Sequence, residues 1–163
     1  MTGVQTCALP IYKVDNLISY QGNKLINVNK ATFTGGEASL KWQQDELFLS
    51  TTYAYVQAKD DETKKDLNRR PRQSLTLTTG WDDGEYGVSA SVVAKSNSKD
   101  FADWPSTTPT TNPGYVTTNV NIYWQPIPMI KLFANIENIG DVNYKTAYNG
   151  NGVYYINGGR QAS

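Results

Sequence analysis

The residues best suited to ligand chemistry form a short basic cluster, Arg69-Arg70-Pro71-Arg72, at the start of a strand-like run. Clustered guanidinium groups could meet a bound ligand, or could form a charged loop end that binds the phosphates of lipopolysaccharide. Aromatic residues of the polar segments add surfaces on which a bulky ligand could stack, or they could form an aromatic girdle or pack loop against loop. The aromatic candidates are Phe101, Trp104, Tyr148, Tyr154 and Tyr155.

The sequence lacks the residue types that several common catalytic sites require. The sequence contains no His and only one Cys, Cys7, which excludes a Ser-His-Asp site, a Cys-His pair and a His-based metal site. The acidic runs 60–62 and 82–83 lack the ligand spacing and turn glycine of a calcium loop, so we expect solvated loops there. Lys plus Arg equals Asp plus Glu, at 15 each, which argues against a nucleic-acid partner. We expect no enzyme, no metal site and no cofactor.

Tryptophans recur at similar intervals along the chain, each at the end of an alternating polar and apolar run and just before a short turn. Trp42, Trp81 and Trp124 all fall on the apolar side of the period-two pattern. Tyr86 follows the turn after Trp81 and joins them. Aromatic residues at strand ends are typical of the lipid boundary of a transmembrane β-barrel, so these four residues predict a membrane girdle.

The strands that position these residues can be read from the same alternation. Short turns follow the second, fourth and sixth strands, whereas long polar loops, 21–29, 58–68, 96–114 and 138–157, follow the others. Outer-membrane barrels combine short periplasmic turns with long extracellular loops. We therefore predict an all-β, antiparallel up-and-down transmembrane β-barrel fragment with a polar lumen, and keep a soluble β-sandwich or β-propeller slice as the alternative. The expected strands are 12–20, 31–42, 46–57, 72–81, 85–95, 115–124, 129–137 and one that begins near 158.

The first residues share no pattern with the rest. Residues 1–11 lack the charged and apolar regions of a signal peptide and resemble the in-frame translation of a sequencing adapter. We expect this segment to be non-native, and residues 12–163 to be an internal slice of a longer barrel domain whose last strand is truncated.

Several segments together resemble the C-terminal third of TonB-dependent outer-membrane receptors. The run Lys13-Val14-Asp15-Asn16-Leu17-Ile18-Ser19-Tyr20 is similar to a segment of the vitamin B12 (cobalamin) transporters. Three further segments resemble a following strand, an arginine cluster before a later strand, and the closing signature of the receptors. They are 29–37, 69–73, and 138–144 with Gly159-Arg160.

The resemblance implies about the last eight of 22 strands in a barrel of the Gram-negative outer membrane. It implies energy-coupled cobalamin import, driven by the TonB system through an N-terminal plug upstream of this slice. By position, Arg69 matches an arginine of the ligand-facing rim and Phe101 an aromatic of the next extracellular loop. Expected partners are outer-membrane lipid, lipopolysaccharide, and cobalamin or another metal chelate. One alternative is a siderophore or metal-chelate receptor, and another is a soluble carbohydrate-binding or adhesion β domain.

Overall fold

The computed structural model describes residues 2–8, 11–21, 24–102, 108–150 and 153–163. These residues form strands joined by turns and loops, and none of them belongs to a helix long and apolar enough to span a membrane. The strands are β1 (Thr2–Ala8), β2 (Ile11–Gln21), β3 (Lys24–Gln44), β4 (Leu47–Asp60), β5 (Gln73–Asp82), β6 (Tyr86–Lys95), β7 (Ser98–Ala102), β8 (Thr108–Asn112), β9 (Tyr115–Ile127), β10 (Ile130–Glu137), β11 (Lys145–Gly150), β12 (Val153–Ile156) and β13 (Gln161–Ala162).

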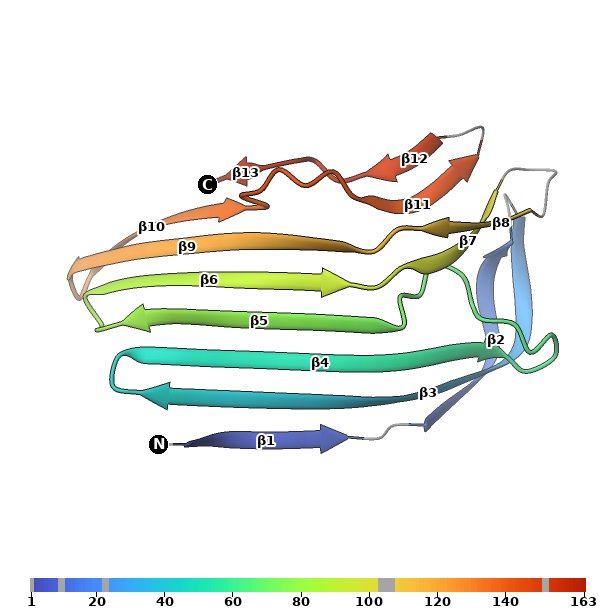
Figure 1. Ribbon diagram of the computed structural model, residues 1–163, viewed down its shortest axis with the longest axis horizontal. Helices are drawn as coiled ribbons and strands as arrows, with labels where there is room; N and C mark the ends of the chain where they lie inside the picture. Colours follow the sequence, from blue (N-terminus) through green and yellow to red (C-terminus); the bar gives the residue numbers. More distant parts are fainter. Residues whose placement is uncertain (1, 9–10, 22–23, 103–107, 151–152) are drawn as a thin grey trace.

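One antiparallel sheet forms the wall, in the order β1-β3-β4-β5-β6-β9-β10-β13, and β2 also pairs with β3 (Figure 1). The long strand β3 carries both β1 and β2 on the edge opposite β4, because β1 pairs with its C-terminal half and β2 with its N-terminal half. From β3 onward, and apart from the two hairpins β7–β8 and β11–β12, neighbouring strands follow one another in sequence. The predicted up-and-down antiparallel fold is confirmed.

Three predicted loop boundaries are wrong. Segments 96–114 and 138–157 are not irregular, since they contain the hairpins β7–β8 and β11–β12. Their Thr and Tyr residues are good strand formers that the polar composition concealed. Within the segment 21–29, Gln21 belongs to β2 and residues 24–29 belong to β3, and the two strands stay paired as far as Gln21 and Lys24. The wall strand β9 also continues through Pro126 to Ile127, which still pairs with Ile130 beside a register shift.

The first residues lack the pattern of the rest of the chain, yet they are part of the sheet. Strand β1 pairs with β3, with Cys7 opposite Ala38 and Thr2 opposite Trp42. A free sheet edge offers unpaired backbone groups that an extended segment can bind whatever its side chains, so this pairing does not require a native sequence. The non-native origin of residues 1–11 stays a prediction.

The register separates the wall into an apolar and a polar face. Residues paired directly across strands share a face, so the pairs Leu77–Val92 and Val92–Thr118 continue one face from β5 to β9. The other face carries the pair Thr78–Ser91, whose hydroxyl groups are hydrogen-bonded at 3.0 Å. On this polar face Asn121 donates a hydrogen bond to Asn135. Several large side chains of the apolar face are exposed, among them Leu75, Val88, Ile122 and Leu132, which suits a lipid-facing wall.

Among the described residues, the buried apolar side chains gather at the loop end of the sheet rather than at its centre. Ala31, Ala58 and Leu67 form a small cluster. Leu67 donates a backbone hydrogen bond to Ala58 (2.9 Å), which fixes the loop between β4 and β5 against the wall. This cluster is the support on which the loop residues described next are held.

Candidate ligand-binding site

Three segments meet at the loop end of the sheet: the loop 61–72 between β4 and β5, the hairpin β7–β8 and the hairpin β11–β12 (Figure 1). The loop and the first hairpin are joined by a backbone hydrogen bond from Arg69 to Lys99 (2.7 Å). The two hairpins are joined by a bond from the Tyr148 amide to the Asp100 carboxylate (2.8 Å). The long connections therefore form one assembly above the wall.

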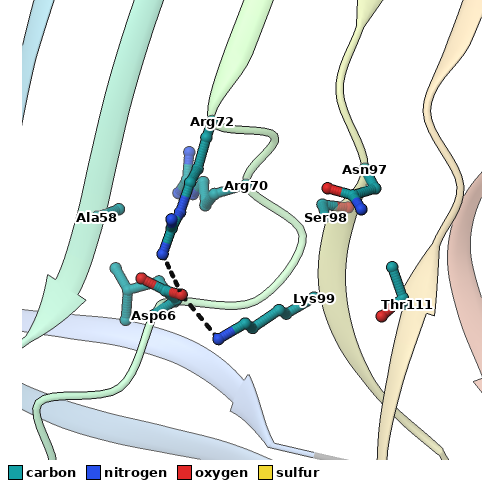
Figure 2. A pocket seen from close by; sticks show the side chains of 9 residues that line it. Ala58, Asp66, Arg70, Arg72, Asn97, Ser98, Lys99 and Thr111 are labelled. Carbon is teal, nitrogen blue, oxygen red and sulfur yellow. Dashed lines mark hydrogen bonds and ion pairs between the residues drawn. The ribbon is translucent and has the colours of Figure 1, made fainter.

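A cavity of about 290 Å³ opens between the loop 61–72 and the hairpin β7–β8 (Figure 2). Arg72 directly precedes β5, and its carbonyl accepts a hydrogen bond from Val56 (2.8 Å), so the antiparallel ladder reaches it. Arg72 is an even number of residues from Ser74 and Thr78, so the three side chains point to the same, polar face. The cavity therefore lies at the loop end of the polar face. We call it the basic pocket; its lining residues are Ala58, Asp66, Leu67, Arg70, Arg72, Asn97, Ser98, Lys99 and Thr111.

The basic pocket combines three cations with one carboxylate. Asp66 Oδ2 lies 2.6 Å from an Arg72 guanidinium nitrogen and 2.8 Å from Lys99 Nζ, and Figure 2 shows both cations directed at this carboxylate. The hydrogen bond from Lys99 lowers the pKa of Asp66, and Arg72 adds to this effect against the opposing effect of burial. Asp66 is thus ionised at neutral pH, and with Arg70 the pocket keeps an excess of positive charge. Such a cavity favours an anionic ligand.

We predict that Asp66→Asn lowers the free energy of unfolding by about 1 kcal/mol at pH 7, because Arg72 and Lys99 lose their shared partner. The pKa of Asp66 is lowered in the folded state, so this stabilisation is fully present above the ordinary value of 3.8 and is lost as the pH falls through the lowered pKa. Urea unfolding of the receptor in vesicles at several pH values measures it. Asp45→Asn, in the exposed turn after β3, is the control. A difference that persists unchanged at pH 2 would contradict the assignment.

Arg69, the arginine expected at the ligand-facing rim, does not line the basic pocket. Its Nε lies 3.1 Å from both carboxylate oxygens of Asp100, and a terminal nitrogen donates to the Tyr148 carbonyl (2.9 Å). Arg70 and Arg72 of the same cluster do line it. The sequence therefore located the arginine cluster. In the structure Arg69 joins two loop hairpins, whereas Arg70 and Arg72 line the cavity.

The predicted aromatic candidates are only partly brought together. The rings of Tyr148 and Tyr154 meet edge to face across the β11–β12 hairpin, with centroids 4.7 Å apart. Tyr155, on the same hairpin, is exposed. Trp104 lies outside the described residues, and for Phe101 only the backbone pairing with Pro109 in β7–β8 is described. For Tyr148 and Tyr154 the arrangement fits packing within the loops, which was one of the alternatives.

Two pocket residues, Asp66 and Lys99, were missed in the sequence. Asp66 sits in a charged loop and Lys99 in a segment expected to be irregular. Their charges could have pointed to them. An acidic residue shortly precedes the arginine cluster, and a lysine lies in the next long loop on the same side of the wall. Alternating loop direction places successive long loops side by side, so the pair could have been proposed from topology.

The four predicted girdle residues lie at the turn end of the wall, opposite the basic pocket. Trp42 pairs with Leu49, and Leu47 of the same strand pairs with Trp81, so both tryptophans share the apolar face. Tyr86 pairs with Trp124, and their rings stack with centroids 6.2 Å apart. These residues are brought to one face and one end; their contact with lipid is a proposal.

An antiparallel meander with an apolar and a polar face, short turns at one end and long interacting loops at the other defines the wall of an outer-membrane β-barrel receptor. Residues 11–139 match the family of TonB dependent receptor-like β-barrels. The chain belongs to this family, whose members are outer-membrane barrels of Gram-negative bacteria. Such receptors are transporters and not enzymes, and membership excludes the soluble carbohydrate-binding alternative.

Solved structures share the fold at low sequence identity. The siderophore receptor PiuA from Acinetobacter baumannii is 20% identical, with a TM-score of 0.68. The match covers 97% of this chain and 25% of PiuA. The ferripyoverdine receptor of Pseudomonas aeruginosa is 15% identical, with 97% and 24% covered and a TM-score of 0.75. The ferric yersiniabactin uptake receptor FyuA from Yersinia pestis is 17% identical, with 99% and 26% covered and a TM-score of 0.75. The chain spans about a quarter of these structures.

Proposed function

We propose that this chain forms part of the wall and extracellular mouth of a TonB-dependent receptor that imports an anionic metal chelate of the siderophore type. The observation that carries the proposal is the basic pocket, which presents Arg70, Arg72 and Lys99 at the loop end of the polar face. Carboxylate, catecholate and phosphate groups are the natural partners of such cations. The receptors of known structure named above are described as binding a siderophore, ferripyoverdine and ferric yersiniabactin, which supports a ligand of this class.

Cobalamin remains the second candidate ligand. The run from Lys13 to Tyr20, which is similar to a segment of the cobalamin transporters, favours it and lies in β2. Charge favours the chelate, since a cobalamin carries one phosphodiester that its cobalt centre balances, whereas the basic pocket has a surplus of cations. We therefore rank the anionic chelate first.

The partners follow from the same proposal. Outer-membrane lipid contacts the apolar face, and Trp42, Trp81, Tyr86 and Trp124 form its periplasmic girdle. Lipopolysaccharide surrounds the loop end, and the TonB system acts through a plug that residues 12–163 do not include. The charged and aromatic loop residues then face the medium from which the chelate arrives.

Uptake by a receptor that carries this chain tests the ligand class. Cells lacking their own chelate and cobalamin receptors would express it and be offered radiolabelled iron as ferric citrate or as a ferric tris-catecholate, and radiolabelled cyanocobalamin in parallel. We expect accumulation of iron from an anionic chelate, abolished when TonB is deleted, and cyanocobalamin uptake at the level of receptor-free cells. TonB-dependent uptake of cyanocobalamin alone would move the assignment to cobalamin.

A further inference from the structure

A buried carboxylate joins the three loop segments at one point. Asp100, in β7, is 3% exposed and accepts hydrogen bonds from three different segments. The donors are Arg69 Nε of the loop 61–72 (3.1 Å), Asn112 Nδ2 of β8 (2.9 Å) and the Tyr148 amide of β11 (2.8 Å). We call these four residues the Asp100 clamp.

The residues next to the clamp line the basic pocket. In the hairpin β7–β8, Lys99 and Thr111 form a cross-strand pair and line the cavity, whereas Asp100 and Asn112 follow them in sequence and belong to the clamp. Successive side chains of a strand point to opposite faces. At Lys99 and Thr111 one face of this hairpin therefore forms a wall of the cavity, while at Asp100 and Asn112 the other face clamps the loops together. Ser98, which pairs with Asn112, also lines the cavity at the start of β7.

The loop 61–72 repeats this arrangement. Arg69 belongs to the clamp, and the next residue, Arg70, lines the cavity. Arg69 has a φ of +58°, a left-handed conformation that is uncommon for a residue with a side chain. A backbone hydrogen bond to Lys99 and the ionic contact with Asp100 hold Arg69 in place. The clamp thus fixes the spacing of the two walls that carry the pocket cations.

A residue with two acceptor oxygens suits this position. The groups that reach Asp100 from Arg69, Asn112 and Tyr148 are all donors, so the central residue must accept every bond. An asparagine has the same size, but it offers one acceptor oxygen and turns an NH₂ group toward a donor. Because Asp100 is buried, the bonds that an asparagine leaves unmet are costly.

We propose that Asp100 is a positioning residue for ligand binding: its carboxylate clamps three extracellular segments together, holds the walls of the basic pocket at binding distance, and couples the β11–β12 hairpin to the occupied pocket. The ligand part of this inference rests on the proposed function, whereas the coupling does not. Because coupling between sites is reciprocal, a ligand that bridges the pocket walls also orders β11–β12.

The test uses Asp100→Asn in a full receptor that carries this chain, with Asp45→Asn at the opposite end of the wall as the matched control. Hydrogen–deuterium exchange is measured for the loop 61–72, β8 and β11, and binding is measured for ferric citrate and a ferric tris-catecholate. We expect exchange in the three segments to rise about tenfold or more in Asp100→Asn, with β5 and β6 unchanged. We expect affinity for the bound chelate to fall about tenfold or more, and the control to match the wild type.

The outcomes separate the two claims. Unchanged exchange in β11, or faster exchange with unchanged affinity, overturns the positioning role of Asp100 and leaves the proposed function standing. A wild-type receptor that binds neither chelate overturns the proposed function, and the exchange measurement still decides whether the clamp couples the three segments. If Asp100→Asn also loses protection in β5 and β6, Asn112→Ala removes a single donor from the clamp and must raise exchange in the same segments. Its failure to do so overturns the proposal.

Discussion

Replacing Arg72 and Lys99 together by glutamine is expected to weaken binding of an anionic ferric chelate by about 100-fold. Both cations contact the same Asp66 oxygen, at 2.6 and 2.8 Å, so they lie close together on the cavity wall that a ligand anion would meet. Glutamine keeps hydrogen-bonding capacity and approximate length while removing the charge. Equilibrium binding to the purified receptor gives the change in affinity directly.

The matched control removes two charges from the same loop without touching the cavity. Lys64 and Lys65 are exposed and do not line the basic pocket, so their double replacement by glutamine should change affinity by less than about threefold. Binding to the wild type should weaken as salt rises, and this dependence should be shallower in the Arg72 and Lys99 variant. Equal losses in both double variants would show that long-range attraction, and not the basic pocket, binds the chelate.

The wall could be predicted from sequence because its signals are local. Alternation of apolar and polar residues fixes which side chains share a face, and turn length fixes the strand order. The placement of Trp81, Tyr86 and Trp124 on one face at the turn end follows from these two facts.

The loop assembly could not be predicted in the same way, because it depends on contacts between distant segments. The cluster of arginines was visible, but the left-handed backbone at Arg69 decides which of them turns to Asp100 and which to the cavity. The hairpin β7–β8 is stabilised by pairing and by the buried Asp100, neither of which leaves an apolar pattern. Asp66 and Lys99 meet because this hairpin lies against the loop 61–72.

The assignment of the two faces leads to the second large effect. Val92 and Val93 are neighbours in β6, and the register places Val92 opposite Leu77 on the apolar face and Val93 opposite Thr76 on the polar face. At roughly 3.4 Å per residue and a tilt of about 40°, Val92 lies about 15 Å above Tyr86, near the middle of a hydrocarbon band of about 25 Å. Val92→Arg is therefore expected to destabilise the inserted barrel by about 2–4 kcal/mol.

Val93→Arg introduces the same side chain one residue away and serves as the control. Its charge would enter the polar lumen beside Thr76 and Thr117, so the expected cost is below about 1 kcal/mol. Folding into vesicles, followed by the heat-sensitive mobility of the folded barrel on gels, measures both variants. Equal costs would mean that the two faces of β6 do not separate lipid from water. A larger cost for Val93→Arg would mean that the face of Val93, and not that of Val92, meets the lipid. In either case the basic pocket, which shares the face of Val93, would no longer open toward a polar lumen, and the proposed import of a chelate would lose its structural basis.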